Sequence, residues 1–114
     1  MKYQSVLVTG TDTGIGKTTV SCGLAAALGA RGVRVGVLKP AETGCARDAE
    51  GELHPEDGHR LAYFAGSGLS PHTVCPYRMP DPLAPSLAAE RAGVSFSIPT
   101  IREHYDAIAT THDI

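Results

Sequence analysis

The fold of this chain is decided by Gly10-Thr11-Asp12-Thr13-Gly14-Ile15-Gly16-Lys17-Thr18. This stretch follows the apolar run Val6-Leu7-Val8 and opens onto a run with helical spacing over residues 18–31. A strand, a glycine-rich turn and a helix in this order are the setting in which a P-loop binds phosphate. Backbone N–H groups of the turn and of the helix start point at one position and favour an anion there. The stretch therefore predicts a nucleotide phosphate site; the alternative is an ordinary glycine-rich turn before a helix.

Individual residues of the stretch match what phosphate binding requires. Lys17 adds a positive charge that reaches the terminal phosphates, and the Thr18 hydroxyl is placed to ligate Mg²⁺. Gly14 and Gly16 let the backbone approach the phosphates without an intervening Cβ. The residues therefore predict that a nucleotide binds here together with Mg²⁺.

The loop departs from the usual pattern G-x-x-x-x-G-K-[ST] at its first position. Thr11 stands where that pattern has its first glycine, and the nearest glycine, Gly10, comes one residue earlier. The related partitioning-type ATPases carry a second signature lysine near the start of the loop, where this chain has Asp12. Because an acid cannot supply the charge of that lysine, the sequence disfavours that subfamily.

The composition limits the classes of protein that need to be considered. With 114 residues, 42% hydrophobic and 19% charged, we expect one globular domain over residues 1–114. The net charge of -2 shows no basic excess, so no nucleic-acid partner is expected. No apolar run approaches the length of a membrane span, so no membrane partner is expected either. Cys22, Cys45 and Cys75 form neither a zinc motif nor a disulfide framework, which predicts a cytoplasmic location.

Hydrophobic periodicity predicts alternating strands and helices. Buried strands are expected at residues 2–9 and 33–38, and helices at residues 18–31, 57–65, 86–92 and from 97–99 onward. Residues 41–56 are polar and contain glycine, so they predict a loop. Five prolines between residues 70 and 85 exclude continuous regular structure there.

This order of elements predicts the α/β class, with a doubly wound, mainly parallel sheet of the P-loop NTPase type and helices on both faces. Residues 112–114 have the character of the start of a third strand. Two parallel strands make a poor independent core, because a parallel sheet needs both faces covered. We therefore expect the chain to be the N-terminal part of a larger domain, truncated where its third strand begins.

A second group of polar residues follows the predicted strand at 33–38. The carboxyl ends of strands face the ligand crevice of a doubly wound sheet, so Lys39 is expected beside the P-loop. Its charge there suits phosphoryl transfer, and the alternative is a solvated lysine at a strand end. Thr43 either donates its hydroxyl to a ligand or forms a turn. Asp57 either caps a helix, which the sequence alone favours, or completes a Mg²⁺ site with Thr18.

Together these segments resemble the dethiobiotin synthetase family, the ATP-dependent ring-closing enzymes of biotin biosynthesis. The resemblance covers essentially all 114 residues, about the first half of a typical member. It is carried by four ordered segments, namely residues 8–18, Lys39-Pro40-x-x-Thr43-Gly44, Glu56-Asp57 and Pro82-Leu83-Ala84-Pro85-Ser86-Leu87-Ala88-Ala89. The first two are specific in combination, and the last two support them.

The resemblance implies a ligase that carboxylates 7,8-diaminononanoate and closes a ureido ring to give dethiobiotin, with MgATP and CO₂ as further substrates. Lys17 and Lys39 would be its catalytic residues, and Thr18 and Asp57 would hold Mg²⁺. The residues that would contact the nucleotide or its metal are Thr13, Gly14, Ile15, Gly16, Lys17, Thr18, Thr19 and Asp57. The residues that would contact the substrate are Thr13, Lys39 and Thr43. The family also implies a homodimer for the full-length protein.

Two other functions stay open at this point. A different carboxylate-activating P-loop enzyme, of the cobyrinate-synthetase-like kind, would consume ATP with its own substrate. A non-catalytic module would bind MgATP without substrate-dependent hydrolysis, although such a module does not need Lys39 and Thr43. A further Mg²⁺-site glutamate of the dethiobiotin synthetases, in a Glu-Gly-Ala-Gly run, lies beyond Ile114. We therefore expect impaired or absent catalysis from residues 1–114 alone.

Overall fold

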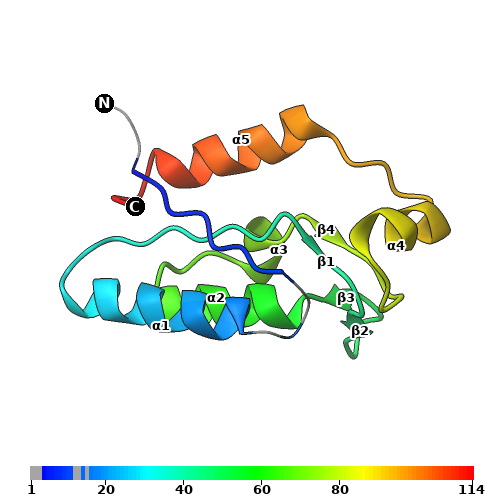
Figure 1. Cartoon of the computed structure of the whole chain (residues 1–114), viewed down its shortest axis with the longest axis horizontal. Helices are drawn as coiled ribbons and strands as arrows, with labels where there is room; N and C mark the ends of the chain where they lie inside the picture. The colour runs from blue at the N-terminus through cyan, green and yellow to red at the C-terminus, as the bar shows by residue number, and fades with distance from the viewer. Residues whose placement is uncertain (1–3, 12–13, 15) are drawn as a thin grey trace.

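The computed structural model describes residues 4–11, 14 and 16–114 and shows a mixed α/β fold (Figure 1). Its elements, in chain order, are α1 (Lys17–Ala30), β1 (Ala41–Glu42), β2 (Ala46–Arg47), β3 (Leu53–His54), α2 (Glu56–Ala65), α3 (Pro71–Val74), β4 (Tyr77–Arg78), α4 (Pro85–Ala92) and α5 (Ile98–Ala109). None of these helices reaches the length and apolar character that crossing a membrane requires.

The helices begin and end where local sequence rules place them. Helix α1 ends in a glycine motif, in which Gly32 has a φ of 82° and the Val33 N–H donates to the Leu28 carbonyl. Helix α5 begins after Ser97, whose hydroxyl accepts the Thr100 N–H. The four helices predicted from periodicity are confirmed, with starts and ends within a residue or so of the predicted positions.

The core lies between α1 and α2. Cys22 of α1 packs with Leu61 and Ala62 of α2 in one buried cluster, and Val37 lies against it. Ala25 and Ala65 pack with Val35 in a second cluster. The small residues on the facing sides of the two helices let their backbones approach closely. The segment at 33–38 packs against both helices through its valine side chains.

The regular sheet is smaller than predicted, and it lies further along the chain. Strand β1 pairs in parallel with β4, with Glu42 opposite Arg78. Strands β2 and β3 form an antiparallel hairpin. The prediction of a loop over residues 41–56 is therefore wrong, because this segment contributes three short strands and begins α2.

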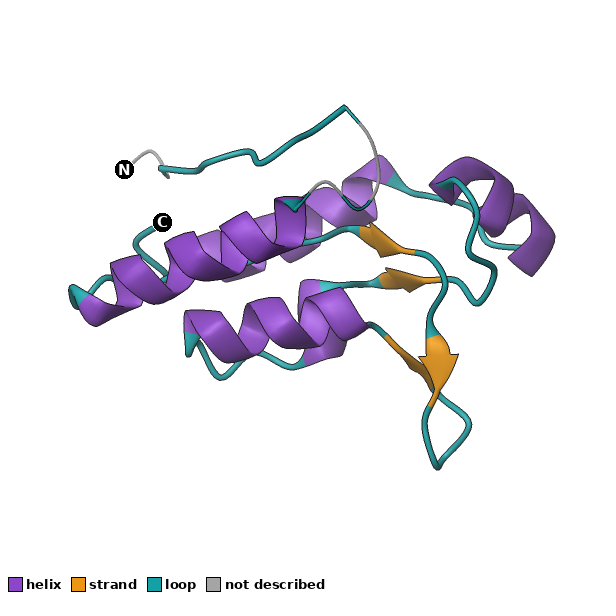
Figure 2. Cartoon of the chain, turned by 60° about the horizontal axis from the view of Figure 1, so that its bottom comes forward, coloured by secondary structure: helices purple, strands orange, loops and turns teal. Residues whose placement is uncertain are grey.

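The two buried strands predicted at residues 2–9 and 33–38 do not form a ladder with each other. Residues 4–9 run as an extended segment without strand pairing (Figure 2), and Leu7 is 89% exposed. Residues 33–38 are extended too, but a cavity of about 350 Å³ lies between the two segments. A strand is held by inter-strand hydrogen bonds, and none of the described backbone bonds joins these segments.

The end of the chain lies beside the 33–38 segment instead. The Gly36 N–H donates to the Ile114 carbonyl at 2.8 Å, and the Ile114 N–H donates to the Arg34 carbonyl at 3.3 Å. Bonds from one residue to the two neighbours of Val35 follow the pattern of parallel strands. These two bonds place Ile114 beside Val35, but residues 112–114 form no regular strand, so the start of a third strand there stays a prediction.

Candidate functional site

The N-terminus of α1 is presented by glycines in the left-handed region. Gly14 has a φ of 76° and Gly16 a φ of 105°, and Gly16 is the N-cap of the helix. A Cβ at either position would meet no atom within 4 Å, so the requirement for glycine is conformational. No side chain caps α1 and no acid lies in its first turn, among the described residues. The helix start therefore keeps its partial positive charge for an anion.

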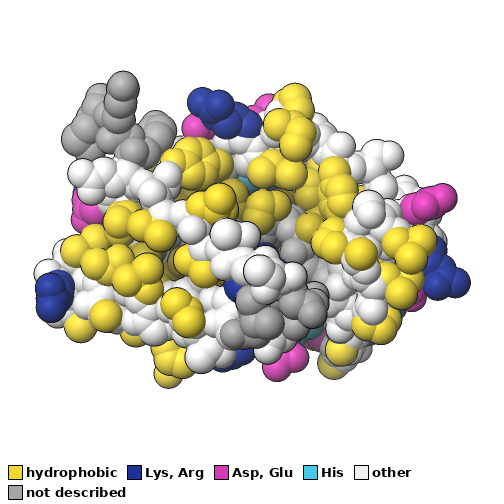
Figure 3. Space-filling model, viewed as in Figure 1, with side chains coloured by type: hydrophobic (Ala, Val, Ile, Leu, Met, Phe, Trp, Pro, Cys, Tyr) yellow, Lys and Arg dark blue, Asp and Glu magenta, His cyan; other side chains and the backbone are white. Residues whose placement is uncertain are grey.

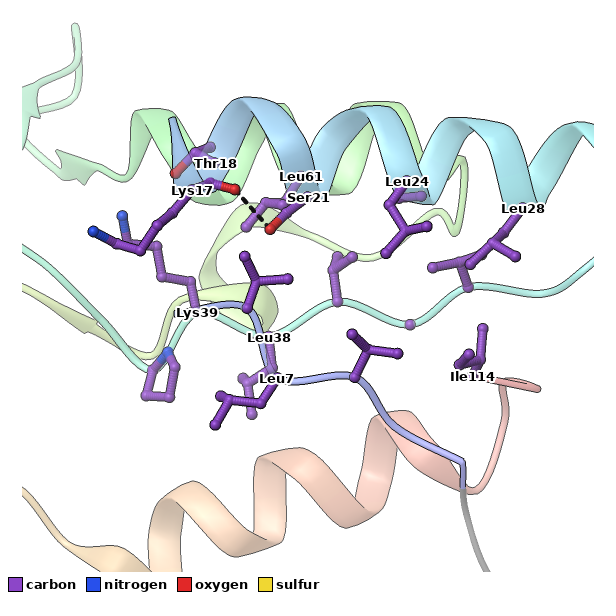
Figure 4. Close-up of a pocket in the computed structure, with 17 residues that line it drawn as sticks. Leu7, Lys17, Thr18, Ser21, Leu24, Leu28, Leu38, Lys39, Leu61 and Ile114 are labelled. Carbon is purple, nitrogen blue, oxygen red and sulfur yellow. Dashed lines mark hydrogen bonds between the residues drawn. The ribbon is translucent and has the colours of Figure 1, made fainter. Parts of the chain in front are cut away.

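Three predicted site residues come together at this helix start. The Thr18 hydroxyl donates to Asp57 Oδ2 at 3.0 Å, and Lys39 Nζ donates to the same oxygen at 2.5 Å. Figure 4 shows Lys17, Thr18 and Lys39 at one end of the cavity described above, with Lys17 and Lys39 extending toward the same region. The P-loop helix, α2 and the residue that follows the 33–38 segment thus each contribute to one polar cluster.

Asp57 is the acid of this cluster. Burial alone would raise the pKa of its carboxyl, but the hydrogen bonds and charge of Lys39, Thr18 and Arg60 hold that pKa below its usual value. Asp57 is therefore ionised at neutral pH. The alternative that Asp57 caps α2 is wrong, because Pro55 is the N-cap and Asp57 lies inside the first turn, with its carboxylate turned to Thr18 and Lys39.

The donor set fits Mg²⁺ bound together with a nucleotide. A carboxylate and a hydroxyl are the hard oxygen ligands that Mg²⁺ prefers, and Mg²⁺ commonly takes one or two carboxylates plus substrate phosphates. Within the described part of the chain no group of three or more His, Cys, Asp or Glu side chains gathers into an all-protein metal site. Thr18 and Asp57 therefore fit a cation that arrives with phosphate oxygens.

The remaining predicted site residues are not joined to the cluster of Thr18, Lys39 and Asp57 by any described hydrogen bond. Thr13 and Ile15 lie outside the described residues. Thr19 is exposed on the first turn of α1. Thr43 is half-buried in the turn after β1, next to Gly44 with its φ of 67°, and no described hydrogen bond joins it to Asp57 or Lys39. The structure thus brings Lys17, Thr18, Lys39 and Asp57 together, but not Thr43.

Sequence reasoning missed Glu42. This side chain is 8% exposed, and its carboxylate accepts the backbone N–H groups of Asp57 and Gly58, both at 3.1 Å. The sequence held one indirect signal, because α2 starts after Pro55, which has no side-chain acceptor for the free N–H groups of the helix. A helix start without its own cap has to find an acceptor elsewhere in the fold.

The rest of the cavity is lined mainly by apolar side chains, with the Ser21 hydroxyl as a polar exception. The apolar side chains that line it include Leu38 and Leu61 near the lysines, and Leu24, Leu28 and Ile114 toward the other end (Figure 4). The molecular face in Figure 3 likewise exposes many hydrophobic side chains. Among the described residues that line this cavity, the charged side chains are Lys17 and Lys39, which lie at one end of it.

Comparison with known proteins agrees with the P-loop and with the resemblance found in the sequence. Residues 4–114 match the model of a family described as an AAA domain. The chain is 40% identical over 111 residues to the ATP-dependent dethiobiotin synthetase of Bacillus velezensis, which is 96% of this chain and 46% of the relative. It is 40% identical over 116 residues to that of Xanthomonas euvesicatoria (100% and 50%). It is 44% identical over 102 residues to that of Ralstonia nicotianae (90% and 43%). The chain therefore spans about half the length of the curated relatives it matches.

Proposed function

Because the chain belongs to the AAA domain family, we propose that it is the nucleotide-binding part of an ATP-dependent dethiobiotin synthetase. One observation carries this proposal: Thr18 at the start of the P-loop helix and Lys39 both bond to the Asp57 carboxylate. Homology to the dethiobiotin synthetases over nearly the whole chain supports the assignment. The protein is thus proposed to be a ligase of biotin biosynthesis.

The proposed reaction converts 7,8-diaminononanoate to dethiobiotin in three bond-forming steps. One amine adds to CO₂ and loses a proton, which gives a carbamate. A carbamate oxygen attacks the γ-phosphorus of ATP, and ADP leaves with the electrons of the broken P–O bond. The second amine then attacks the carbonyl carbon of the mixed anhydride and loses a proton, and inorganic phosphate leaves with the electrons of the broken C–O bond as the ureido ring closes.

The residues are proposed to act mainly by neutralising charge, because phosphoryl transfer depends on positioning and electrostatic stabilisation. Lys17 and Lys39 place two ammonium groups near the transferring phosphoryl group and the carbamate. Thr18 and Asp57 would hold Mg²⁺, which supplies further positive charge at the phosphates. Gly14 and Gly16 bring the backbone close to the nucleotide; Thr13, Ile15 and Thr19 are proposed as further nucleotide contacts. Thr13 and Thr43 are proposed contacts to the substrate.

Lys39 is held in the site by the negative charge of Asp57, the same carboxylate that is proposed to bind Mg²⁺. Its ion pair with Asp57 is about one-third exposed on each side, so the ammonium is only partly desolvated. Because the pair keeps some exposure to solvent, the Lys39 ammonium is proposed to turn from Asp57 to a phosphate oxygen when nucleotide binds. Lys39 is therefore positioned at the proposed reacting end of the cavity by its ion pair with Asp57.

The wider setting is also proposed from the homology. The chain would form one P-loop domain whose sheet, in the longer protein, is doubly wound with helices on both faces. The full-length protein would be a cytoplasmic homodimer that acts on small molecules alone.

Mass-spectrometric detection of dethiobiotin tests the function directly. The purified chain is incubated with MgATP, bicarbonate and 7,8-diaminononanoate, and Lys17→Ala serves as the blank. Product above the blank would support the complete proposal. Calorimetric titration with MgATP runs alongside on chain shown to be folded. Binding that Lys17→Ala abolishes, without product, would support the nucleotide-binding part and leave catalysis to the longer protein; absence of binding would refute the proposal.

A further inference from the structure

We propose that Glu42 is a positioning residue for the Thr18–Asp57 pair. Its buried carboxylate caps α2 from strand β1 and thereby fixes the place of the Asp57 side chain relative to the P-loop helix. The inference rests on the proposed role of Thr18 and Asp57 in holding Mg²⁺. It adds a residue that would touch neither nucleotide nor substrate.

Glu42 contacts the backbone of Asp57, the proposed Mg²⁺ ligand, directly. Its Oε2 accepts the N–H of Asp57 itself, and its Oε1 accepts the N–H of Gly58, both at 3.1 Å. The Asp57 side chain then bonds onward to Thr18 and Lys39. A single chain of hydrogen bonds therefore runs from Glu42 through the backbone of Asp57 to the start of α1.

A carboxylate is well suited to this position. Helix α2 has no cap of its own, since Pro55 offers no side-chain acceptor, and its first N–H groups carry partial positive charge. A buried carboxylate costs free energy unless it is hydrogen-bonded, and two charge-assisted bonds from the helix start compensate for that burial. The same two bonds therefore cap the start of α2 and compensate for the burial of the Glu42 carboxylate.

Glu42 is itself held firmly. Its carbonyl accepts the Met79 N–H at 2.9 Å within the parallel pairing of β1 and β4, and Met79 is fully buried. The helix start has little room to shift, because a Cβ at Gly58 would lie 3.0 Å from the Cβ of Cys75, which is also fully buried. The cap therefore transmits the position of the β1–β4 pair to Asp57.

The same short segment also carries Lys39. The Lys39 N–H donates to the Val74 carbonyl at 2.9 Å, next to the pairing of β1 with β4. Residues 39–42 thus supply both the ammonium that meets Asp57 and the carboxylate that holds the backbone of Asp57. Moving this segment would move both partners of the acid together.

The test measures how strongly Mg²⁺ improves nucleotide binding, which does not require turnover. Binding of ATP is titrated at fixed Mg²⁺ concentrations and in EDTA, for the wild-type chain and for Asp57→Ala, Glu42→Ala and Glu42→Gln. Loss of a group that orients a metal ligand typically weakens metal binding by roughly 10-fold or more. For Glu42→Ala we therefore expect a rise of that size in the Mg²⁺ concentration that gives half of the improvement in ATP affinity. Glu42→Gln keeps one acceptor oxygen and should shift it less. ATP affinity in EDTA should stay unchanged, because the P-loop is untouched.

Asp48→Asn is the matched control. Asp48 Oδ1 also accepts two backbone N–H groups, from Glu50 at 3.0 Å and Glu52 at 2.9 Å, but in the exposed turn between β2 and β3. It should leave the Mg²⁺ effect unchanged. Thermal melts identify folded variants, and if Glu42→Ala does not fold, Glu42→Gln decides.

The outcomes separate the two proposals. If Asp57→Ala removes the Mg²⁺ effect and folded Glu42 variants keep the wild-type value, the positioning role is overturned and the Mg²⁺ site stands. If the wild-type chain binds ATP equally with and without Mg²⁺, both are overturned. A shift in the Glu42 variants that Asp48→Asn lacks supports the inference, since loss of stability alone would not change the ratio of the two affinities.

Discussion

Gly36 is the position where the 33–38 segment, which leads to Lys39, meets α5. A Cβ built at Gly36 would lie 2.4 Å from Cγ2 of Ile108 and 3.2 Å from the ring of His112. Ile108 is 6% exposed and β-branched, so its methyl group cannot swing into solvent. Overpacking of this kind costs about 1–3 kcal/mol, and we expect Gly36→Ala to lower the free energy of unfolding by that amount.

Urea denaturation followed by circular dichroism measures this change. Gly23→Ala is the control: a Cβ at Gly23 meets no atom within 4 Å, and alanine in a helix interior should stabilise α1 by roughly 0.5–1 kcal/mol. Shortening Ile108 removes the group that clashes, so Gly36→Ala combined with Ile108→Ala should be less destabilising than the sum of the single changes. Coupled neighbours show interaction energies of about 0.5–3 kcal/mol. A Gly36→Ala protein as stable as wild type, or strict additivity, would refute the packing of α5 on this segment.

Three further predictions concern titration and hydrogen bonding. Asp57 has a pKa below its usual value of 3.8, so its contribution to stability is present above that pH and is lost as the pH falls through the folded-state pKa. Asp57→Asn should therefore flatten this part of an acid-unfolding curve, and identical curves for the variant and the wild type would contradict the prediction. Burial raises the pKa of Cys75 from 9.0 to about 12. The Cys75 thiol should therefore make stability fall with rising pH across that window by up to about 1.4 kcal/mol per pH unit, and Cys75→Ala should reduce the slope by that contribution in denaturant melts. Tyr77→Phe removes the hydroxyl that accepts the Ser97 N–H at 3.0 Å, and a loss of about 1 kcal/mol in the same melts is expected; no loss would show that water replaces the bond.

Local rules were enough for the helices and for the P-loop helix start. Ser97, near which the last helix is predicted to start, caps α5, and Gly66 and Gly93 end α2 and α4 in the left-handed region that glycine favours. The placement of Lys39 near Thr18 was also predictable. In a doubly wound fold the segments before and after the P-loop helix run in the same direction, so their carboxyl ends face the same crevice.

Strand pairing was not predictable to the same degree. The apolar runs at 2–9 and 33–38 predict strands, but a run of β-branched residues does not say which segment supplies the partner. In the structure a cavity separates the described part of the first run from the second, and the bonds of Gly36 go to Ile114. Regular pairing appears instead at β1 and β4, in segments without a strong pattern of their own.

The sequence by itself determined that this chain has a glycine-rich P-loop followed by a helix, with Lys17 and Thr18 at the helix start. The reason is that glycine φ angles, helix starts and the charge of Lys17 act over a few residues. Only the tertiary structure decided that Asp57 turns to Thr18 and that Glu42 caps α2. Those contacts join residues 39 and 15 positions apart, and which acceptor reaches an uncapped helix start depends on how the whole core packs.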